Sequence, residues 1–204
     1  MTKRLIRSLA TGALLAGMTL AAPAFAAIAT GTSAPAFDAQ ASQAGKSFSY
    51  SLAEALKKGP VIVYFFPSAY TGGCDIEAHA FATEAAKFTA AGATIIGVSA
   101  DSIQRLNSFS ADPNYCAGKF PVASDPDGKI AASFDLKMSA AEPQAKDVRG
   151  DVIDHGFISR TTFVIGKDGK VAAVFSSEAD HLHPQDHVSK SLAIVQQMQS
   201  PKAP

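Results

Sequence analysis

Two adjoining stretches decide the fold: Val61-Ile-Val-Tyr-Phe-Phe66, and directly after it Pro67-Ser-Ala-Tyr-Thr71-Gly-Gly-Cys74. The first is a continuous apolar run rich in β-branched and aromatic residues, which is typical of a strand buried on both faces. The chain from Cys74 to Ala91 is rich in Ala and Glu and stops at Gly92, which predicts a helix. A buried strand that turns into a helix is the first half of an α/β unit.

The remaining segments extend this unit into one domain, predicted for residues 27–204. We expect an α/β fold in which a parallel strand pair is extended by an antiparallel hairpin, so that helices flank a central mixed sheet. A lead-in of irregular structure is expected before the first helix, and a polar irregular segment before the hairpin. The predicted elements are the lead-in 27–50, a short helix 51–56 with a Ser51–Glu54 capping box, a strand 94–99, a helix opened by Asp101, one or two helical turns at 129–134, the irregular segment 137–158, hairpin strands 161–165 and 171–175, and a helix 184–199.

The candidate reactive residue is Cys74, because sites in open α/β sheets form beyond the carboxyl ends of the strands. Its thiol belongs to the first turn of a helix, where unpaired backbone N–H groups and the helix dipole favour an anion. We therefore expect its pKa to lie below the usual value of about 8.5. Thr71 offers a hydroxyl to the thiolate or to a bound oxygen atom. Gly72 and Gly73 permit close backbone approach, and Pro67, which lacks an N–H, can wall off one side.

The composition indicates a globular protein without a nucleic-acid partner. Of the 204 residues 47% are hydrophobic, and 18 basic residues balance 18 acidic ones, so the chain has no basic excess. Residues 1–26 have the pattern of a cleavable signal peptide: Lys3, Arg4 and Arg7, an apolar stretch, and Ala24-Phe25-Ala26. The stretch is shorter than the about 20 residues of a membrane span, which favours a cleaved signal peptide over an uncleaved membrane anchor. After cleavage we expect no membrane contact. The expected location is periplasmic or secreted, where disulfides are permitted.

In this order along the chain, the features resemble the peroxiredoxin family of the AhpC/TSA type. Pro67, Thr71 and Cys74 fit the family's Pro-x-x-x-Thr-x-x-Cys signature, and Arg160, just before the hairpin, matches its site arginine. Residues 31–37 resemble the family's lead-in, and Glu77 resembles the bacterioferritin-comigratory, or PrxQ-like, branch. The resemblance covers about residues 31–175. It implies a thioredoxin-like fold, which agrees with the predicted order of elements.

The resemblance implies a thiol-dependent peroxidase that reduces hydrogen peroxide and small organic hydroperoxides. The Cys74 thiolate would attack the O–O bond and become a sulfenic acid. Arg160 would stabilise the thiolate and the charge on the leaving oxygen, while Thr71 and nearby backbone N–H groups would hold the peroxide in line. No cofactor is implied. Turnover would need an external thiol donor, thioredoxin-like or glutaredoxin-like, and we expect a monomer or weak dimer.

Cys116 is the candidate second thiol, which would condense with the Cys74 sulfenic acid into an intramolecular disulfide. Many PrxQ-like proteins carry this thiol five residues after the first, where this chain has His79. Other members place it on the following helix, and Cys116 lies in that region. A disulfide needs Cα atoms within about 7 Å, so we expect both segments to unwind locally. Pro113 and Gly118 would make the Cys116 side a weak helix.

Two other functions stay open from these residues. One is an exported thiol–disulfide oxidoreductase, although Glu77 stands where a Cys-x-x-Cys motif needs its second thiol. The other is a non-catalytic thioredoxin-fold module in which Cys74 and Cys116 form a structural disulfide. Arg149 competes with Arg160 as the site arginine. Glu77 fits a solvated helix position equally well, and His79 fits a helix surface.

The segment around Pro184 contains three histidines and one aspartate within seven residues. Such a group could bind zinc or copper. The residues straddle the predicted helix start, so their spacing does not set them on one face, and we assign them no metal role. They are His181, His183, Asp186 and His187.

Overall fold

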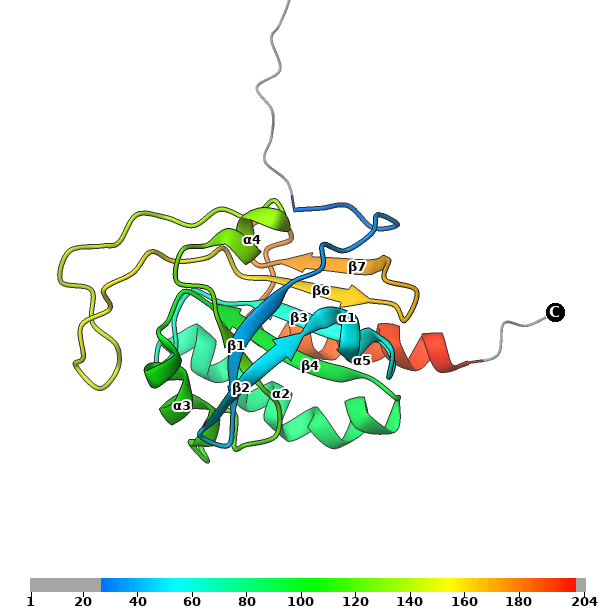
Figure 1. Cartoon of the computed structure of the whole chain (residues 1–204), viewed down its shortest axis with the longest axis horizontal. Coiled ribbons are helices and arrows are strands. Elements are labelled where there is room, and N and C mark those ends of the chain that lie inside the picture. Colours follow the sequence, from blue (N-terminus) through cyan, green and yellow to red (C-terminus); the bar gives the residue numbers. More distant parts are fainter. Residues whose placement is uncertain (1–26, 201–204) are drawn as a thin grey trace, which may run out of the picture.

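A seven-stranded mixed sheet in the order β2-β1-β5-β4-β3-β6-β7 is the centre of the computed structural model, which describes residues 27–200 (Figure 1). The signal peptide expected at residues 1–26 lies outside the described residues. The central strands β3 (Val61–Phe65) and β4 (Thr94–Ser99) are parallel, and β6 (Thr161–Ile165) with β7 (Val171–Ser176) continues the sheet antiparallel beside β3. The predicted mixed sheet, with a parallel pair and an antiparallel hairpin, is therefore confirmed.

Helices cover both faces of the sheet and bury two apolar layers. Every residue of β3 is buried, and its side chains alternate between the layers because successive strand residues point to opposite faces. Tyr64 belongs to the layer under α2, α3 and α5, and Phe65 to the layer under α1 and α4. The helices are α1 (Leu52–Leu56), α2 (Gly72–Ala90), α3 (Ile103–Ala111), α4 (Lys129–Ser133) and α5 (Pro184–Gln199).

The expectation of an irregular lead-in over residues 27–50 is wrong for its second half. Residues Asp38–Gln43 form β1 and Lys46–Ser51 form β2, an antiparallel hairpin whose turn holds Ala44 and Gly45 at positive φ. These strands consist mainly of Ala, Ser, Gln and Lys, which have weak β propensity. Hydrogen bonding between strands stabilises them instead, since β1 pairs with β2 on one side and with the three-residue strand β5 (Val122–Ser124) on the other. Strand β5 was also not predicted.

The third helix begins one residue later than predicted. Ser102 is its N-cap, and the Ser102 side chain accepts a hydrogen bond from the backbone N–H of Arg105 at 3.3 Å. Asp101, which the sequence placed as the opening residue, is instead fully buried. Its carboxylate is therefore available for contacts inside the protein.

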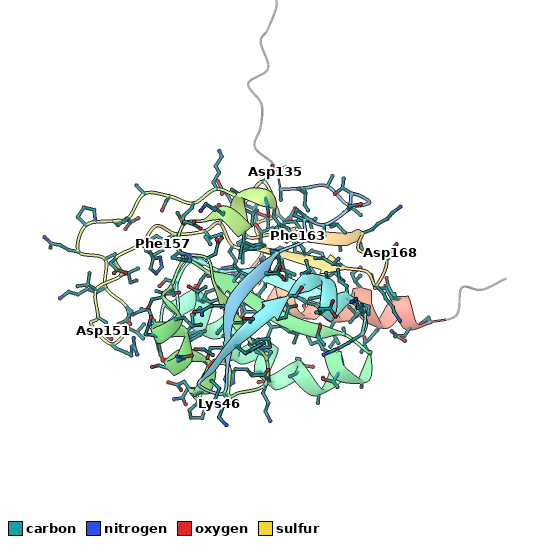
Figure 2. All side chains as sticks on the ribbon, viewed as in Figure 1. Lys46, Asp135, Asp151, Phe157, Phe163 and Asp168 are labelled. Atoms are coloured by element: carbon teal, nitrogen blue, oxygen red, sulfur yellow. The ribbon has the colours of Figure 1, made fainter. Side chains whose placement is uncertain are left out.

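A long irregular segment, residues 137–158, runs from α4 back to β6, as predicted. Apart from isolated bridges such as Met138 to Ile158, it has no regular pairing. Asp151 marks its outermost turn and Phe157 its return toward the sheet, where Phe163 lies in the interior (Figure 2). No helix within residues 27–200 is long and apolar enough to cross a membrane.

Candidate active site

Cys74 lies where the loop after β3 becomes helix α2. Thr71 is the N-cap, with an extended backbone, so Cys74 is the third residue of the helix, as expected from the sequence. The loop turns sharply at Tyr70, whose φ of +60° is in the left-handed region that non-glycine residues rarely adopt. Cys74 exposes only 2% of its surface. The thiol is thus held at a helix N-terminus beneath the protein surface.

The side chain of Arg160 reaches Cys74 from the start of β6. Its Nη2 donates to the Cys74 Sγ at 3.1 Å, and its Nη1 pairs with Glu77, one turn further along α2. A side chain at Gly73 would place its Cβ 3.1 Å from the same Nη2, so this glycine leaves room for the guanidinium. A Cβ at Gly72 would have nothing within 4 Å, so that glycine has no such role. The structure brings together two residues 86 positions apart.

Glu77 is fully buried, so the interpretation as a solvated helix residue is wrong. Burial raises the pKa of Glu77 to about 7, although the Arg160 guanidinium opposes this shift. One carboxylate oxygen, Oε1, has no hydrogen-bond partner among the described residues. Cys74 and Glu77 therefore share one guanidinium. Burial disfavours the charged form of each side chain, and Arg160 favours it.

The expected low pKa of the Cys74 thiol is not what the site produces. Burial raises the pKa of this thiol, and the Arg160 charge, the Ser68 backbone and the Thr71 hydroxyl only partly offset the increase. The helix N-terminus and the arginine were visible in the sequence, but the burial was not. Polar contacts to the sulfur therefore work against burial, and the thiolate fraction depends on the balance between the two.

The two other residues of the signature border the loop. The Thr71 hydroxyl donates to the Ser68 carbonyl at 2.8 Å, and Thr71 remains half-buried next to the sulfur. Pro67 is partly exposed at the start of the loop. The competing arginine, Arg149, is engaged elsewhere: it pairs with Asp147 and lies over the Tyr70 ring, 3.3 Å from the ring centroid. Arg160 is therefore the arginine that contacts the sulfur.

Cys116 is buried in a turn between α3 and β5, and both cysteines are free thiols. Backbone hydrogen bonds shape the segment as a turn with Ala117 and Gly118 at positive φ, so the predicted weak helix at this position is wrong. Burial raises the pKa of Cys116 well above its usual value. Burial also raises the pKa of Tyr64. Cys74, Cys116 and Tyr64 belong to the same apolar layer on one face of the sheet.

His187 joins this site from helix α5, which the sequence did not indicate. It is fully buried, and its Nδ1 and Nε2 lie 2.9 Å from the Thr162 hydroxyl and 3.0 Å from the Ser177 hydroxyl. Its Nδ1 is 3.8 Å from the free oxygen of Glu77. Burial lowers the pKa of His187 to about 4, so it is neutral. His181 and His183 are exposed, while His79 is a surface residue whose Nδ1 is 3.0 Å from the Asn114 carbonyl.

A buried cysteine at a helix N-terminus, in contact with an arginine on a thioredoxin-like sheet, defines a thiol-based redox protein. Residues 30–174 match the profile of the AhpC/TSA family, so the chain belongs to this family. It is therefore a peroxiredoxin, a thiol peroxidase whose substrate class is peroxides.

Individual relatives agree with this assignment. Chloroplastic peroxiredoxin Q of Sedum lineare is 28% identical over 174 residues, which are 85% of this chain and 81% of the relative. The crystal structure of peroxidoxin BcpB from Mycobacterium tuberculosis is 29% identical with a TM-score of 0.69, covering 84% of this chain and 98% of that one. The bacterioferritin comigratory protein of Xanthomonas campestris is 25% identical with a TM-score of 0.62, covering 80% and 92%. The bacterioferritin-comigratory and PrxQ-like resemblance is thus confirmed.

Proposed function

We propose that this peroxiredoxin reduces hydrogen peroxide and small organic hydroperoxides through Cys74, with Cys116 as the resolving thiol. The observation that carries the proposal is the 3.1 Å contact between Arg160 Nη2 and Cys74 Sγ. A guanidinium at this distance stabilises a thiolate and also the negative charge that develops on the oxygen leaving the peroxide. Thr71 and the first backbone N–H groups of α2 orient the peroxide for in-line attack.

The first step transfers one oxygen atom. The Cys74 thiolate attacks the nearer peroxide oxygen, an S–O bond forms, and the O–O bond breaks. The departing alkoxide or hydroxide takes the proton that the thiol released, so the products are an alcohol or water and the Cys74 sulfenic acid.

The second step forms a disulfide. The Cys116 thiol attacks the sulfenic sulfur of Cys74, the S–O bond breaks, and water leaves. Two observations support this role: both thiols are free, and both are buried in the same apolar layer on one face of the sheet. The turn that holds Cys116 contains Ala117 at φ +50°, a strained conformation that would relax when the turn opens. Since Cys74 belongs to a helical turn, the first turn of α2 must also unwind.

Regeneration uses an external dithiol, thioredoxin-like or glutaredoxin-like, which reduces the disulfide and is itself oxidised. We propose that this cycle takes place in the periplasm or outside the cell, because residues 1–26 have the basic, apolar and Ala-x-Ala pattern of a signal peptide. The exported protein would comprise residues 27–204 and act as a monomer or weak dimer. Amino-terminal sequencing of the exported protein tests this, with Ala27 as the expected first residue. An intact Met1 or the next residue at the amino terminus would overturn the export proposal.

The catalytic proposal is tested by counting thiols. Reduced protein treated with one equivalent of hydrogen peroxide should lose both thiols within seconds, and Cys74→Ser should abolish peroxide consumption. Cys116→Ser should leave a sulfenic acid at Cys74 that dimedone traps, identified by mass spectrometry of the peptide. If Cys116→Ser turns over normally with a thioredoxin-type donor, the resolving role fails. Rapid exchange with dithiols but slow reaction with peroxide would favour an oxidoreductase instead.

A further inference from the structure

The loop before Cys74 is held in place by a buried carboxylate from the end of β4. Asp101 Oδ2 accepts the backbone N–H of Ala69 at 2.8 Å, and Oδ1 accepts the Ser68 hydroxyl at 3.0 Å. Arg105 donates from Nη2 to the Ala69 carbonyl at 2.9 Å. Both polar groups of Ala69 are therefore fixed by side chains outside the loop, and Ser68 and Ala69 are fully buried.

This clamp acts on the reactive sulfur through Ser68 and Thr71. Hydrogen bonding from the Ser68 backbone is one of the interactions that lower the pKa of Cys74, against the larger effect of burial. The Ser68 carbonyl also accepts the Thr71 hydroxyl at 2.8 Å, which sets the direction of that hydroxyl. The Ser68 N–H belongs to the preceding peptide and the Ser68 carbonyl to the Ser68–Ala69 peptide, so a shift of Ser68 would move both polar contacts that serve Cys74 and its substrate.

His155, from the irregular segment 137–158, binds the same carboxylate. Its Nε2 lies 2.9 Å from Asp101 Oδ1, and its Nδ1 lies 2.8 Å from the Gly156 carbonyl. A carboxylate and a carbonyl are both acceptors, so each nitrogen needs its own proton to make both bonds. A neutral imidazole carries only one such proton. The geometry thus calls for the imidazolium form.

The charged groups around His155 favour that form. Asp101 and Asp154 face it with negative charge, while Arg105 Nε, 2.8 Å from Asp101 Oδ1, faces it with positive charge. Arg105 also pairs with Asp147, whose Oδ2 lies 2.8 Å from Arg105 Nη2, so two carboxylates share the Arg105 charge. Burial alone would lower the pKa of His155, but the hydrogen bonds with Asp101 and Gly156 outweigh it and raise the pKa.

We propose that His155, as an imidazolium, is a positioning residue of the peroxide site: through Asp101 it fixes the Ser68–Ala69 peptide beside Cys74, and its deprotonation loosens that peptide and slows peroxide reduction. This inference rests on the proposed role of Cys74. The sign follows from the contacts. The clamp is complete at low pH and weakens as the pH rises through the raised pKa of His155. One ring nitrogen then loses its proton, so it can no longer donate a hydrogen bond to Asp101 or to the Gly156 carbonyl.

The protonation state is tested without peroxide, by nitrogen-15 NMR of the histidine ring. His155 is assigned from the signals lost in His155→Gln. The expected spectra show both ring nitrogens protonated at low pH and a titration midpoint above the 6.5 of a free imidazole, whereas Asp101→Asn should lower that midpoint. A midpoint at or below 6.5 in the wild-type protein would overturn the proposal, whatever Cys74 does.

The positioning role is tested by two rates at Cys74, in the Cys116→Ser background. The rate of oxidation by hydrogen peroxide is divided by the rate of alkylation by iodoacetamide, which cancels the thiolate fraction. In the protein that keeps His155, this ratio of rates should fall by about tenfold as the pH rises through the pKa of the imidazolium. A fall of about tenfold is the loss expected for one charge-assisted hydrogen bond. In His155→Gln it should be low and independent of pH.

The exposed His181→Gln variant is the matched control and should retain the wild-type profile. A ratio in His155→Gln that equals the wild-type ratio at every pH would refute the positioning role, as would a wild-type ratio that does not change with pH. Failure of the proposed function gives a different result, because Cys74 would then react with iodoacetamide but not with peroxide in all variants.

Discussion

Replacing Glu77 by Gln changes the charge that competes with Cys74 for Arg160. In the native site Arg160 Nη1 pairs with Glu77 and Nη2 contacts the sulfur, so one guanidinium serves two acids. Gln keeps the size of the side chain and an oxygen that accepts from Arg160, but it removes the negative charge. Cys74 then has the arginine charge to itself, and the pKa of its thiol should fall.

The size of this effect follows from the titration of Glu77. A like charge within about 4–6 Å moves the pKa of an acid by about 1–3 units, and we take about one unit because Arg160 contacts both groups. One unit is about tenfold more thiolate wherever the thiol is mostly protonated. Lower basicity makes each thiolate about threefold less reactive, which leaves a net gain of about threefold. Since the pKa of Glu77 is about 7, the gain should appear at pH 8 and vanish at pH 6.

The assay is alkylation of Cys74 by iodoacetamide from pH 6 to pH 8, in Cys116→Ser protein so that one thiol reacts. Glu84→Gln on the same helix is the control, because its carboxylate pairs with Lys87 at the surface. The ratio of Glu77→Gln to wild type should rise with pH toward about three, while the control ratio stays at one. A ratio below one at pH 8 would refute the reasoning, since Glu77 would then serve Cys74 by orienting Arg160.

Two further predictions concern the packing around this site. Because the pKa of His187 is about 4, its burial should lower the free energy of unfolding by about 3 kcal/mol between pH 6.5 and pH 4. Urea unfolding should show that His187→Gln lacks this part of the pH dependence, and an unchanged dependence would contradict it. Gly97→Ala should cost about 1–3 kcal/mol, because its Cβ would lie 2.6 Å from Tyr64 Cζ. Tyr64→Phe should be nearly neutral in the same measurement, since that hydroxyl has no partner among residues 27–200; equal stabilities of Gly97→Ala and wild type would refute the packing argument.

The central strand and the reactive helix could be predicted because their signals are local. The apolar run at residues 61–66 is typical of a strand in a sheet covered on both faces, and Gly92 marks the end of the helix. The hairpin 38–51 could not be predicted, since Ala, Ser and Gln carry little preference and its first strand is completed by pairing with β5. The same holds for β5 itself, a strand of three residues.

The site was predictable as far as its residues follow a motif. The motif residues and Arg160 were located from the sequence, and the structure places Arg160 against Cys74. The burial of Glu77 could not be predicted, because its partner lies 83 positions away and a lone Glu on a helix favours solvent. The prediction that the pKa of Cys74 is lowered was wrong for the same reason, because the burial that raises it depends on the whole fold. Asp101 has the pattern of a helix cap, and nothing near His155 indicates its contact with that carboxylate.

The central claim is that Arg160 activates Cys74 toward peroxide, and the most direct measurement is the second-order rate of Cys74 oxidation by hydrogen peroxide at pH 7. Arg160→Gln is combined with Glu77→Gln, so that no buried carboxylate loses its partner, and is compared with Glu77→Gln alone, both with Cys116→Ser. The account predicts a loss of about a hundredfold or more, with unchanged urea unfolding. A rate within about threefold of the comparison protein would contradict it, because sulfur and guanidinium would then be neighbours without a shared chemical role.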